Sequence, residues 1–287
     1  MSEMQQIQWF PGHMTKTKRK IEASLKLVDA VAEIIDARVP VSSRNPDLDS
    51  LIGGKPRVIL MNKCDMADPK ETARWISEYQ KKGVPAIAVD CKSGRGLNNF
   101  IPLIKCVLRD KIKAWEEKGM VGRTIRVMIV GIPNVGKSSF INKMAKGNRA
   151  KVEDRPGVTR GNQWFTVGKG FDLLDTPGVL WPKFDDPAVG ERLAFTGAVK
   201  DQVMDIELLA CRLLELLTGA YNAALEERFK VKSDELTGLD GYDMLELVGK
   251  RRGMLMSGGV VNTERAAIMV LDEYRGGKLG AITLERV

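Results

Sequence analysis

The stretch GIPNVGKS, residues 131–138, constrains the fold of this chain more than any other feature. It matches the pattern G-x-x-x-x-G-K-[ST], whose glycines let backbone N–H groups turn inward around phosphates. The apolar run RTIRVMIVG before it predicts a buried strand, and SSFINKMAK after it predicts the start of a helix. This strand–loop–helix context is the one the pattern requires, because the positive end of the helix then faces the anion. The stretch therefore predicts a phosphate-binding loop in a doubly wound, mostly parallel α/β domain.

Two residues of this loop have specific predicted roles. Lys137 would bridge the β- and γ-phosphates of a nucleotide, and the Ser138 hydroxyl would ligate Mg²⁺. The other predicted nucleotide contacts in the loop are Asn134, Val135, Gly136 and Ser139.

A second motif, DTPG, follows the short strand FDLLD. Asp175 is placed to hold Mg²⁺, and the Gly178 N–H to reach a γ-phosphate. Thr159, in PGVT, stands 21 residues after Ser138. That spacing favours a switch threonine that closes on Mg²⁺ and the γ-phosphate, the alternative being a residue of an ordinary turn.

A third motif, NKCD, follows the apolar strand RVILM. Asp65 can accept hydrogen bonds from both N1–H and the 2-amino group of guanine, and adenine would leave this carboxylate unpaired. Asn62 is predicted to hold the loops and O6, and the Lys63 stem to lie over the ring, with Cys64 between Lys63 and Asp65. The three motifs together predict a GTPase with GTP and GDP as its ligands, rather than an ATPase.

The stretch VDCKSGRG, after the strand PAIAV, is predicted to complete the base pocket. GTPases usually carry Ser-Ala-Lys there, whereas this chain has Asp90, Cys91 and Lys92. The base contact at this turn is largely a backbone N–H, so a small cysteine can substitute.

The order of these motifs predicts a circular permutation. In ordinary GTPases the guanine motif follows the phosphate loop, whereas here it precedes it. A doubly wound sheet tolerates such a cut, because its termini lie at the surface. We therefore predict a permuted GTPase domain over residues 1–187 and a smaller all-α domain over 188–287, in which DIELLACRLLELLTG, GYDMLELVGKRRG and TERAAIMVLDEYRGG have helical patterns.

The chain as a whole resembles the bacterial ribosome biogenesis GTPase A family. The resemblance rests on WFPGHM, DARVPVSSRNP, NKCD, GIPNVGKS, PGVT, DTPGVLWP and a helical tail. It implies a cytoplasmic protein, expected to be a monomer, that binds a late precursor of the large ribosomal subunit. It also implies that GTP is hydrolysed on the docked particle, which promotes maturation and release, and that the helical domain binds rRNA.

The charge distribution suits a polyanion partner. Residues 101–150 carry a net charge of +8, equal to that of the whole chain, and the basic run includes Lys105, Arg109, Lys111 and Lys113. The alternative is a basic surface that serves solubility. Residues 191–287 carry −3, so RNA binding by the helical domain would rest on a local patch at Lys250, Arg251 and Arg252. Those residues would equally suit a solvated helix end.

The residue after DTPG is Val179, where Ras-like enzymes use a glutamine to orient the attacking water. Catalysis must therefore draw on another group. The single histidine, His13, either positions that water or caps the next helix while Trp9 and Phe10 anchor the segment. Asn134 either helps to bind a potassium ion against the phosphates or stabilises its loop.

Other classes are disfavoured by composition. No apolar run approaches the length of a membrane span, and the N-terminus lacks a signal pattern, so a cytoplasmic protein without membrane contact is expected. The four cysteines form no C-x-x-C pair, which argues against zinc and disulfides. Two further observations, no Cys-His cluster and no room for an N-terminal barrel before residue 28, disfavour the small-subunit type of permuted GTPase. An RNA-binding chaperone in which GTP only sets the conformation remains an alternative.

Overall fold

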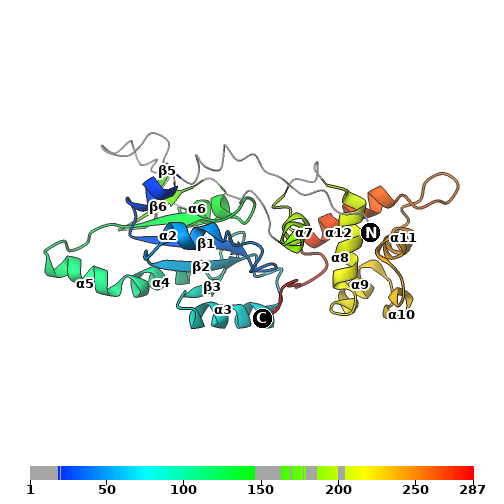
Figure 1. The fold of residues 1–287 in the computed structure, drawn as a ribbon, viewed down its shortest axis with the longest axis horizontal. Helices are drawn as coiled ribbons and strands as arrows, with labels where there is room; N and C mark the ends of the chain where they lie inside the picture. The colour runs from blue at the N-terminus through cyan, green and yellow to red at the C-terminus, as the bar shows by residue number, and fades with distance from the viewer. Residues whose placement is uncertain are drawn as a thin grey trace. The chain divides into compact units, whose positions relative to one another are not determined.

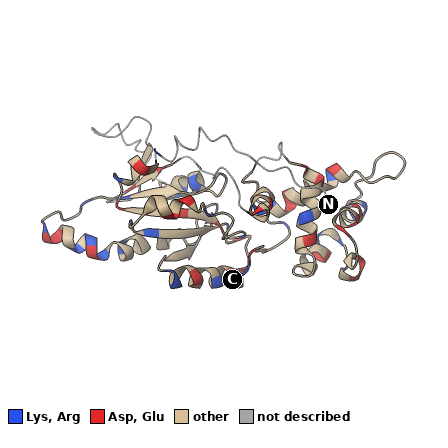
Figure 2. Ribbon diagram, in the orientation of Figure 1, with Lys and Arg blue, Asp and Glu red and all other residues tan. Residues whose placement is uncertain are grey.

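The protein, shown in Figure 1 as a computed structural model, combines a β-sheet with helices. The structure describes residue 19 and residues 21–145, 163–168, 170–176, 178, 186–199 and 204–287. Charged residues are frequent on the helices and few on the strands (Figure 2).

The sheet has six strands in the order β3-β2-β1-β4-β6-β5. All neighbours are parallel except β5 and β6, which are antiparallel. The strands are β1 (Ala30–Asp36), β2 (Arg57–Asn62), β3 (Ala86–Ala88), β4 (Ile125–Val130), β5 (Gln163–Thr166) and β6 (Phe171–Asp175). The strand before the phosphate loop, β4, thus lies centrally and pairs with β1, which precedes it by almost a hundred residues. This arrangement confirms the permuted, mostly parallel fold.

Both faces of the sheet are covered. All seven residues of β1 are buried, as expected of a central parallel strand whose side chains alternate between two packed faces. On one face, Val31 belongs to a cluster with Ile21 and Leu25, from a helical stretch at residues 21–25, and with Leu48 of α2 (Asp47–Ile52). The sequence analysis did not predict β1, although AVAEIID is a short apolar run.

The remaining helices of the sheet follow their strands. Phe100 of α4 and Phe140 of α6 meet edge to face, with ring centroids 5.0 Å apart. These helices are α3 (Pro69–Lys81), η1 (Leu97–Asn99, a 3₁₀ turn), α4 (Phe100–Val107), α5 (Arg109–Glu117) and α6 (Lys137–Met144).

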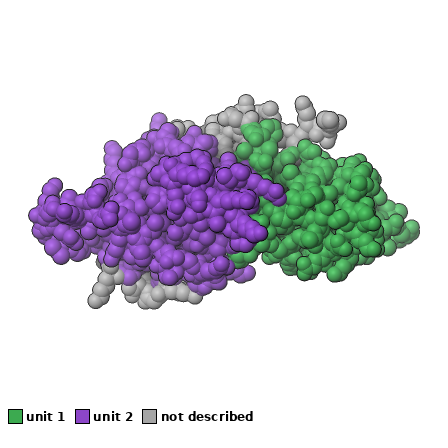
Figure 3. Space-filling model, turned by 90° about the horizontal axis from the view of Figure 1, so that it is seen from below, with its two compact units in different colours: residues 1–7, 65–68, 184–284 green, residues 8–64, 69–183, 285–287 purple. Residues whose placement is uncertain are grey.

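Two compact units are present (Figure 3). The sheet unit contains the described residues of 8–64, 69–183 and 285–287, and the helical unit contains those of 65–68 and 184–284. In the helical unit α8 packs against α7, α11 and α12. The helices are α7 (Pro187–Phe195), α8 (Ile206–Leu217), α9 (Asn222–Phe229), α10 (Ser233–Leu236), α11 (Gly241–Arg251) and α12 (Thr263–Arg275).

The helical stretches predicted from periodicity are confirmed as α8, α11 and α12. Asp205 and Asp240 cap the first two through their carboxylates, and Asn262 caps the third. Among the described residues, no helix combines the length and apolarity that crossing a membrane requires.

Candidate functional site

The carboxyl ends of the parallel strands place polar side chains along one edge of the sheet. Asp36 ends β1 directly opposite Asn62, which ends β2. Asp175 ends β6, one residue from the end of its pairing partner β4. In doubly wound sheets this edge is where ligands bind, because the loops that leave the strands converge there.

The phosphate loop leaves β4 at Gly131 and enters α6 at Lys137. Gly136, which precedes the helix, has φ +104°, a conformation that residues with a Cβ rarely adopt. A Cβ at this position would lie 2.3 Å from Nδ2 of Asn62. The glycine therefore allows the guanine motif and the phosphate loop to touch.

The side chain of Lys137 folds back over its own loop. Its Nζ donates to the carbonyl oxygens of Gly131 and Ile132, at 3.0 and 2.7 Å. Burial lowers the pKa of Lys137 to about 8, and the charge of Asp175 only partly offsets this. No carboxylate lies within ion-pair distance of Lys137 in the described part of the chain. A buried ammonium beside a helix N-terminus and without a carboxylate partner suits a phosphate.

The loop after β6 reaches the same place. A Cβ on Gly178 would lie 2.8 Å from Nζ of Lys137 and 2.9 Å from the backbone nitrogen of Pro133. The Thr176 hydroxyl donates to the carbonyl oxygen of Ile129 at 2.6 Å, which ties this loop to β4. The Gly178 backbone thus closes on the phosphate loop, where the sequence predicted a γ-phosphate contact.

The predicted magnesium ligands come from these two loops. Ser138 is exposed in the first turn of α6, and Asp175 is half-buried at the end of β6. Burial raises the pKa of Asp175, and Lys137 works against that shift. Hydroxyl and carboxylate oxygens are the donors Mg²⁺ prefers, and a divalent cation would offset the cost of burying this carboxylate. The residues present therefore fit a magnesium ion held with the phosphates.

Asn62 joins three loops. Its Nδ2 donates to the carbonyl oxygen of Val135 in the phosphate loop at 2.6 Å. Its Oδ1 accepts from the backbone N–H of Cys91 at 2.9 Å. The side chain is buried, so both bonds are protected from water. One amide thereby ties the guanine motif to the phosphate loop and to the turn after β3.

The rest of the guanine motif turns away from the strand. Lys63 has a left-handed backbone with φ +60°, and its ammonium lies 2.9 Å from Oδ2 of Asp36. The backbone N–H of Cys64 donates to the carbonyl oxygen of Val89 at 3.3 Å. Asp65 is exposed and available to accept hydrogen bonds from a base.

The turn of Asp90, Cys91 and Lys92 is built by its first residue. The two carboxylate oxygens of Asp90 accept from the backbone N–H groups of Lys92 and Ser93, at 2.7 and 3.1 Å. Burial opposes ionisation of Asp90, yet a hydrogen bond from the Ser93 side chain and these two backbone hydrogen bonds outweigh it and lower the pKa of Asp90. Cys91 is buried beside Asn62. In this turn aspartate thus fixes the backbone.

The remaining predicted site residues lie partly inside and partly outside the described residues. Asn134 is exposed with φ +60°, Val135 is buried and Ser139 is exposed in α6. His13, Thr159 and Val179 lie outside the described residues.

Asp36 and its partner Arg38 belong to this edge, and the sequence analysis assigned them no role. A sequence pattern that could have indicated Asp36 is present, because the apolar run AVAEIID ends in this carboxylate as FDLLD ends in Asp175. Among the described residues no group of three or more His, Cys, Asp or Glu side chains could hold a metal. All four cysteines are free thiols.

Comparison with known proteins finds GTPases that are named for ribosome binding or ribosome biogenesis. Residues 126–229 match the family described as 50S ribosome-binding GTPase. The chain is 47% identical over 279 residues to a Bacillus cereus protein named ribosome biogenesis GTPase A, covering 97% of this chain and 93% of that protein. It is 33% identical to the Thermotoga maritima protein of the same name, covering 97% and 94%.

Solved structures agree with the sequence relatives. A structure of GNP-bound YlqF from T. maritima superposes with a TM-score of 0.66 at 30% identity, covering 94% of this chain and 98% of that one. A GDP-bound YlqF structure gives a TM-score of 0.67 at 27% identity, covering 93% and 99%.

Proposed function

The chain belongs to the ribosome biogenesis GTPase A family, and from that membership we propose that it acts late in the assembly of the large ribosomal subunit. It binds the precursor particle and its rRNA as a cytoplasmic monomer. It hydrolyses GTP to GDP and phosphate when docked, which promotes maturation and its own release.

The observation that carries the nucleotide part of this proposal is the pair of hydrogen bonds made by Asn62. They bring the guanine motif, the phosphate loop and the turn after β3 to one place, although these segments stand in permuted order. A pocket for a purine nucleotide needs all three together.

In this site the loops share the contacts to phosphate, magnesium and base. Lys137 holds the β- and γ-phosphates, and Asp65 accepts from the guanine base. Ser138, Thr159 and Asp175 hold Mg²⁺, which when bound offsets phosphate charge. Gly178 and the Thr159 backbone contact the γ-phosphate.

Hydrolysis needs a group that replaces the glutamine missing at position 179. His13 would orient the attacking water on the docked particle. A potassium ion near Asn134 would neutralise charge in the transition state. Potassium is tested by comparing hydrolysis rates in KCl and NaCl at equal ionic strength, where equal rates would remove it from the mechanism.

RNA contact is proposed for the helical domain, residues 188–287, and for a basic depression on the sheet unit. The depression has a volume of about 630 Å³ and is formed by α4, α5 and the turn before β4. Its lining includes Lys105, Arg109, Lys113, Trp115 and Arg123.

The lining of the depression carries four basic residues and one acidic residue, Glu116. Arg123 stacks on Trp115, with its guanidinium carbon 4.0 Å from the ring centroid, and pairs with Asp29. Across the described residues, Lys105, Arg109 and Lys113 have no carboxylate within ion-pair distance. Figure 2 shows Lys and Arg along α4 and α5, interspersed with acidic residues on α5. A cationic surface with an aromatic ring suits an RNA backbone with an unpaired base.

The test is sedimentation of the protein with ribosomal subunits and precursors, in the presence of a non-hydrolysable GTP analogue, GDP or no nucleotide. Co-sedimentation with precursors and faster hydrolysis on them support the proposal. Full maturation and release with the analogue would favour an RNA chaperone in which GTP only sets the conformation. The double variant Lys105→Glu/Lys113→Glu should bind precursor particles more weakly, so that less protein co-sediments with them. The salt dependence of this binding should fall, and the affinity for GDP should not change.

A further inference from the structure

The DARVP stretch that opens the loop after β1 has no role in the chemistry described so far. Its first residue, Asp36, is 1% exposed and lies opposite Asn62 in the register of β1 and β2. A buried carboxylate at the ligand-binding edge of a sheet is costly unless it is paired. Its partners therefore indicate its use.

The first partner, Arg38, holds the carboxylate still. Its Nε donates to Oδ1 of Asp36 at 3.0 Å and its Nη2 to Oδ2 at 2.8 Å. The backbone N–H of Arg38 also donates to Oδ1, at 3.0 Å. Arg38 is itself 1% exposed. A two-point contact between buried groups fixes the orientation of the carboxylate plane.

The second partner is Lys63 of the guanine motif. Its Nζ lies 2.9 Å from Oδ2 of Asp36, and its side chain is 20% exposed. The two loops are also joined through the backbone, where Ala37 N–H donates to the carbonyl oxygen of Asn62 at 2.8 Å. Burial opposes ionisation of Asp36, but Arg38 and then Lys63 outweigh it and hold its pKa below the ordinary range.

The contact with Asp36 restricts the conformations of the Lys63 side chain. A free lysine samples many rotamers, and ordering them on ligand binding lowers affinity. Asp36 anchors the far end of Lys63, so the aliphatic stem that lies along the purine ring is ordered before the nucleotide arrives. We propose that Asp36 is a positioning residue for guanine-nucleotide binding and that it acts through Lys63. This inference rests on the proposed guanine site.

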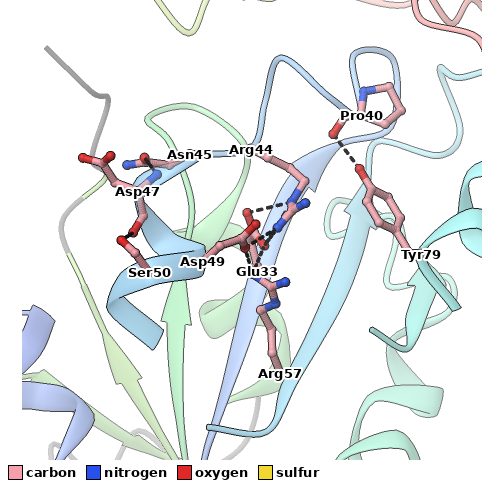
Figure 4. Close-up of polar contacts among 9 residues, drawn as sticks. All are labelled: Glu33, Pro40, Arg44, Asn45, Asp47, Asp49, Ser50, Arg57 and Tyr79. Carbon is pink, nitrogen blue, oxygen red and sulfur yellow. Dashed lines mark hydrogen bonds and ion pairs between the residues drawn. The ribbon is translucent and has the colours of Figure 1, made fainter. Parts of the chain in front are cut away.

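A purely structural ion pair is the competing explanation, and β1 provides a matched control for it. Glu33, three residues before Asp36, is fully buried and pairs with Arg44 and Arg57 (Figure 4). Neither arginine belongs to a nucleotide loop. Glu33→Gln therefore removes a buried, arginine-paired carboxylate from the same strand without touching Lys63.

The experiment measures equilibrium binding of GDP and IDP to the full-length chain. Asp36→Asn should weaken both nucleotides by roughly three- to tenfold, the cost of ordering one long side chain. The ratio of GDP to IDP affinity should not change, because Asp65 alone reads the 2-amino group that IDP lacks. Glu33→Gln should leave both affinities unchanged. A fall in the GDP/IDP ratio for Asp36→Asn would show general distortion of the loop and overturn the proposal.

A double-mutant cycle tests the route through the lysine. Lys63→Met keeps an apolar stem of similar length but removes the ammonium, so Asp36→Asn should cause no further loss in that background. An undiminished loss there would overturn the proposal. If Asp36→Asn does not fold because Arg38 loses its ionised carboxylate partner, Asp36→Asn/Arg38→Gln takes its place in both measurements. Failure of the unaltered chain to bind GDP would instead contradict the guanine site itself.

Discussion

At the scale of single residues, Asn62 is expected to contribute both to the stability of the fold and to nucleotide binding. Asn62→Ala leaves the Cys91 N–H and the Val135 carbonyl without their partner in a buried place. We expect a loss of about 1–3 kcal/mol in the free energy of unfolding, together with much weaker GDP binding. Urea unfolding with and without GDP measures both. Gln80→Ala, exposed in α3, removes an amide outside the nucleotide loops and serves as the control, and an unchanged GDP affinity for Asn62→Ala would contradict the bridging role.

His13 also belongs to this scale. If it orients the attacking water, His13→Ala should lower hydrolysis on the docked particle by about 10²–10⁴-fold, the range of general acid–base catalysis. GDP affinity should not change, because no predicted base or phosphate contact is lost. Single-turnover hydrolysis with and without ribosomal subunits separates these quantities. Unchanged stimulated turnover would leave His13 only the alternative role of capping the next helix.

At the scale of elements, the last residues of the chain act on the loop after β1. Glu285 accepts from the backbone N–H groups of Val41 and Ser42, at 2.6 and 3.1 Å, and its carbonyl accepts from Trp75 Nε1. Glu285→Ala should therefore lower the free energy of unfolding of the sheet unit by about 1–3 kcal/mol, since two N–H groups lose a charged acceptor. Denaturant unfolding followed by tryptophan fluorescence measures it. The neighbouring Arg286→Ala is exposed and should have no effect.

In the helical unit, Glu273 joins α12 to α9 and to Arg252, the residue that follows α11. The Nε of Arg228 donates to its carboxylate at 2.8 Å, and Arg252 lies at 3.4 Å. Burial opposes ionisation, but Arg228, Arg252 and Lys278 outweigh it and lower the pKa of Glu273. A depressed carboxyl pKa stabilises the fold above the unfolded value of 4.5, and this stability is lost as pH falls through the folded pKa.

Glu273→Gln should accordingly lower the Tm at neutral pH, and the difference from the unaltered chain should shrink as pH falls below 4.5. Thermal unfolding at a series of pH values measures this trend. Glu264→Gln, exposed on the same helix, is the control. A difference independent of pH would contradict the ionic role of Glu273.

At the scale of the whole molecule, nucleotide binding should be visible as stability. GDP at about 100 times its Kd should raise the free energy of unfolding of the sheet unit by about 2.7 kcal/mol. ADP at the same concentration should not, because adenine leaves the Asp65 carboxylate unpaired. Calorimetry in the presence of Mg²⁺ measures both. Equal stabilisation by ADP would contradict guanine selectivity.

The sequence alone determined the order of the loops along the chain and predicted their chemistry. GIPNVGKS, DTPG and NKCD each need only a strand end and a short local spacing, and these are encoded by neighbouring residues. The strands β2, β4 and β6 and the helices α8, α11 and α12 were predictable because their apolar patterns are local. The permuted order followed directly from reading the motifs along the chain.

Only the tertiary structure decided which of these loops support one another. Asp36 meets Lys63 because the strand order places β1 beside β2. Glu285 meets Ser42, 243 residues away, because the last residues run back to the loop after β1. No periodicity carries that information, since a strand-end carboxylate has the same local pattern whether it faces a metal, a lysine or water. A role for Asp175 could thus be predicted from its motif, whereas the role proposed for Asp36 depended on β1 lying beside β2.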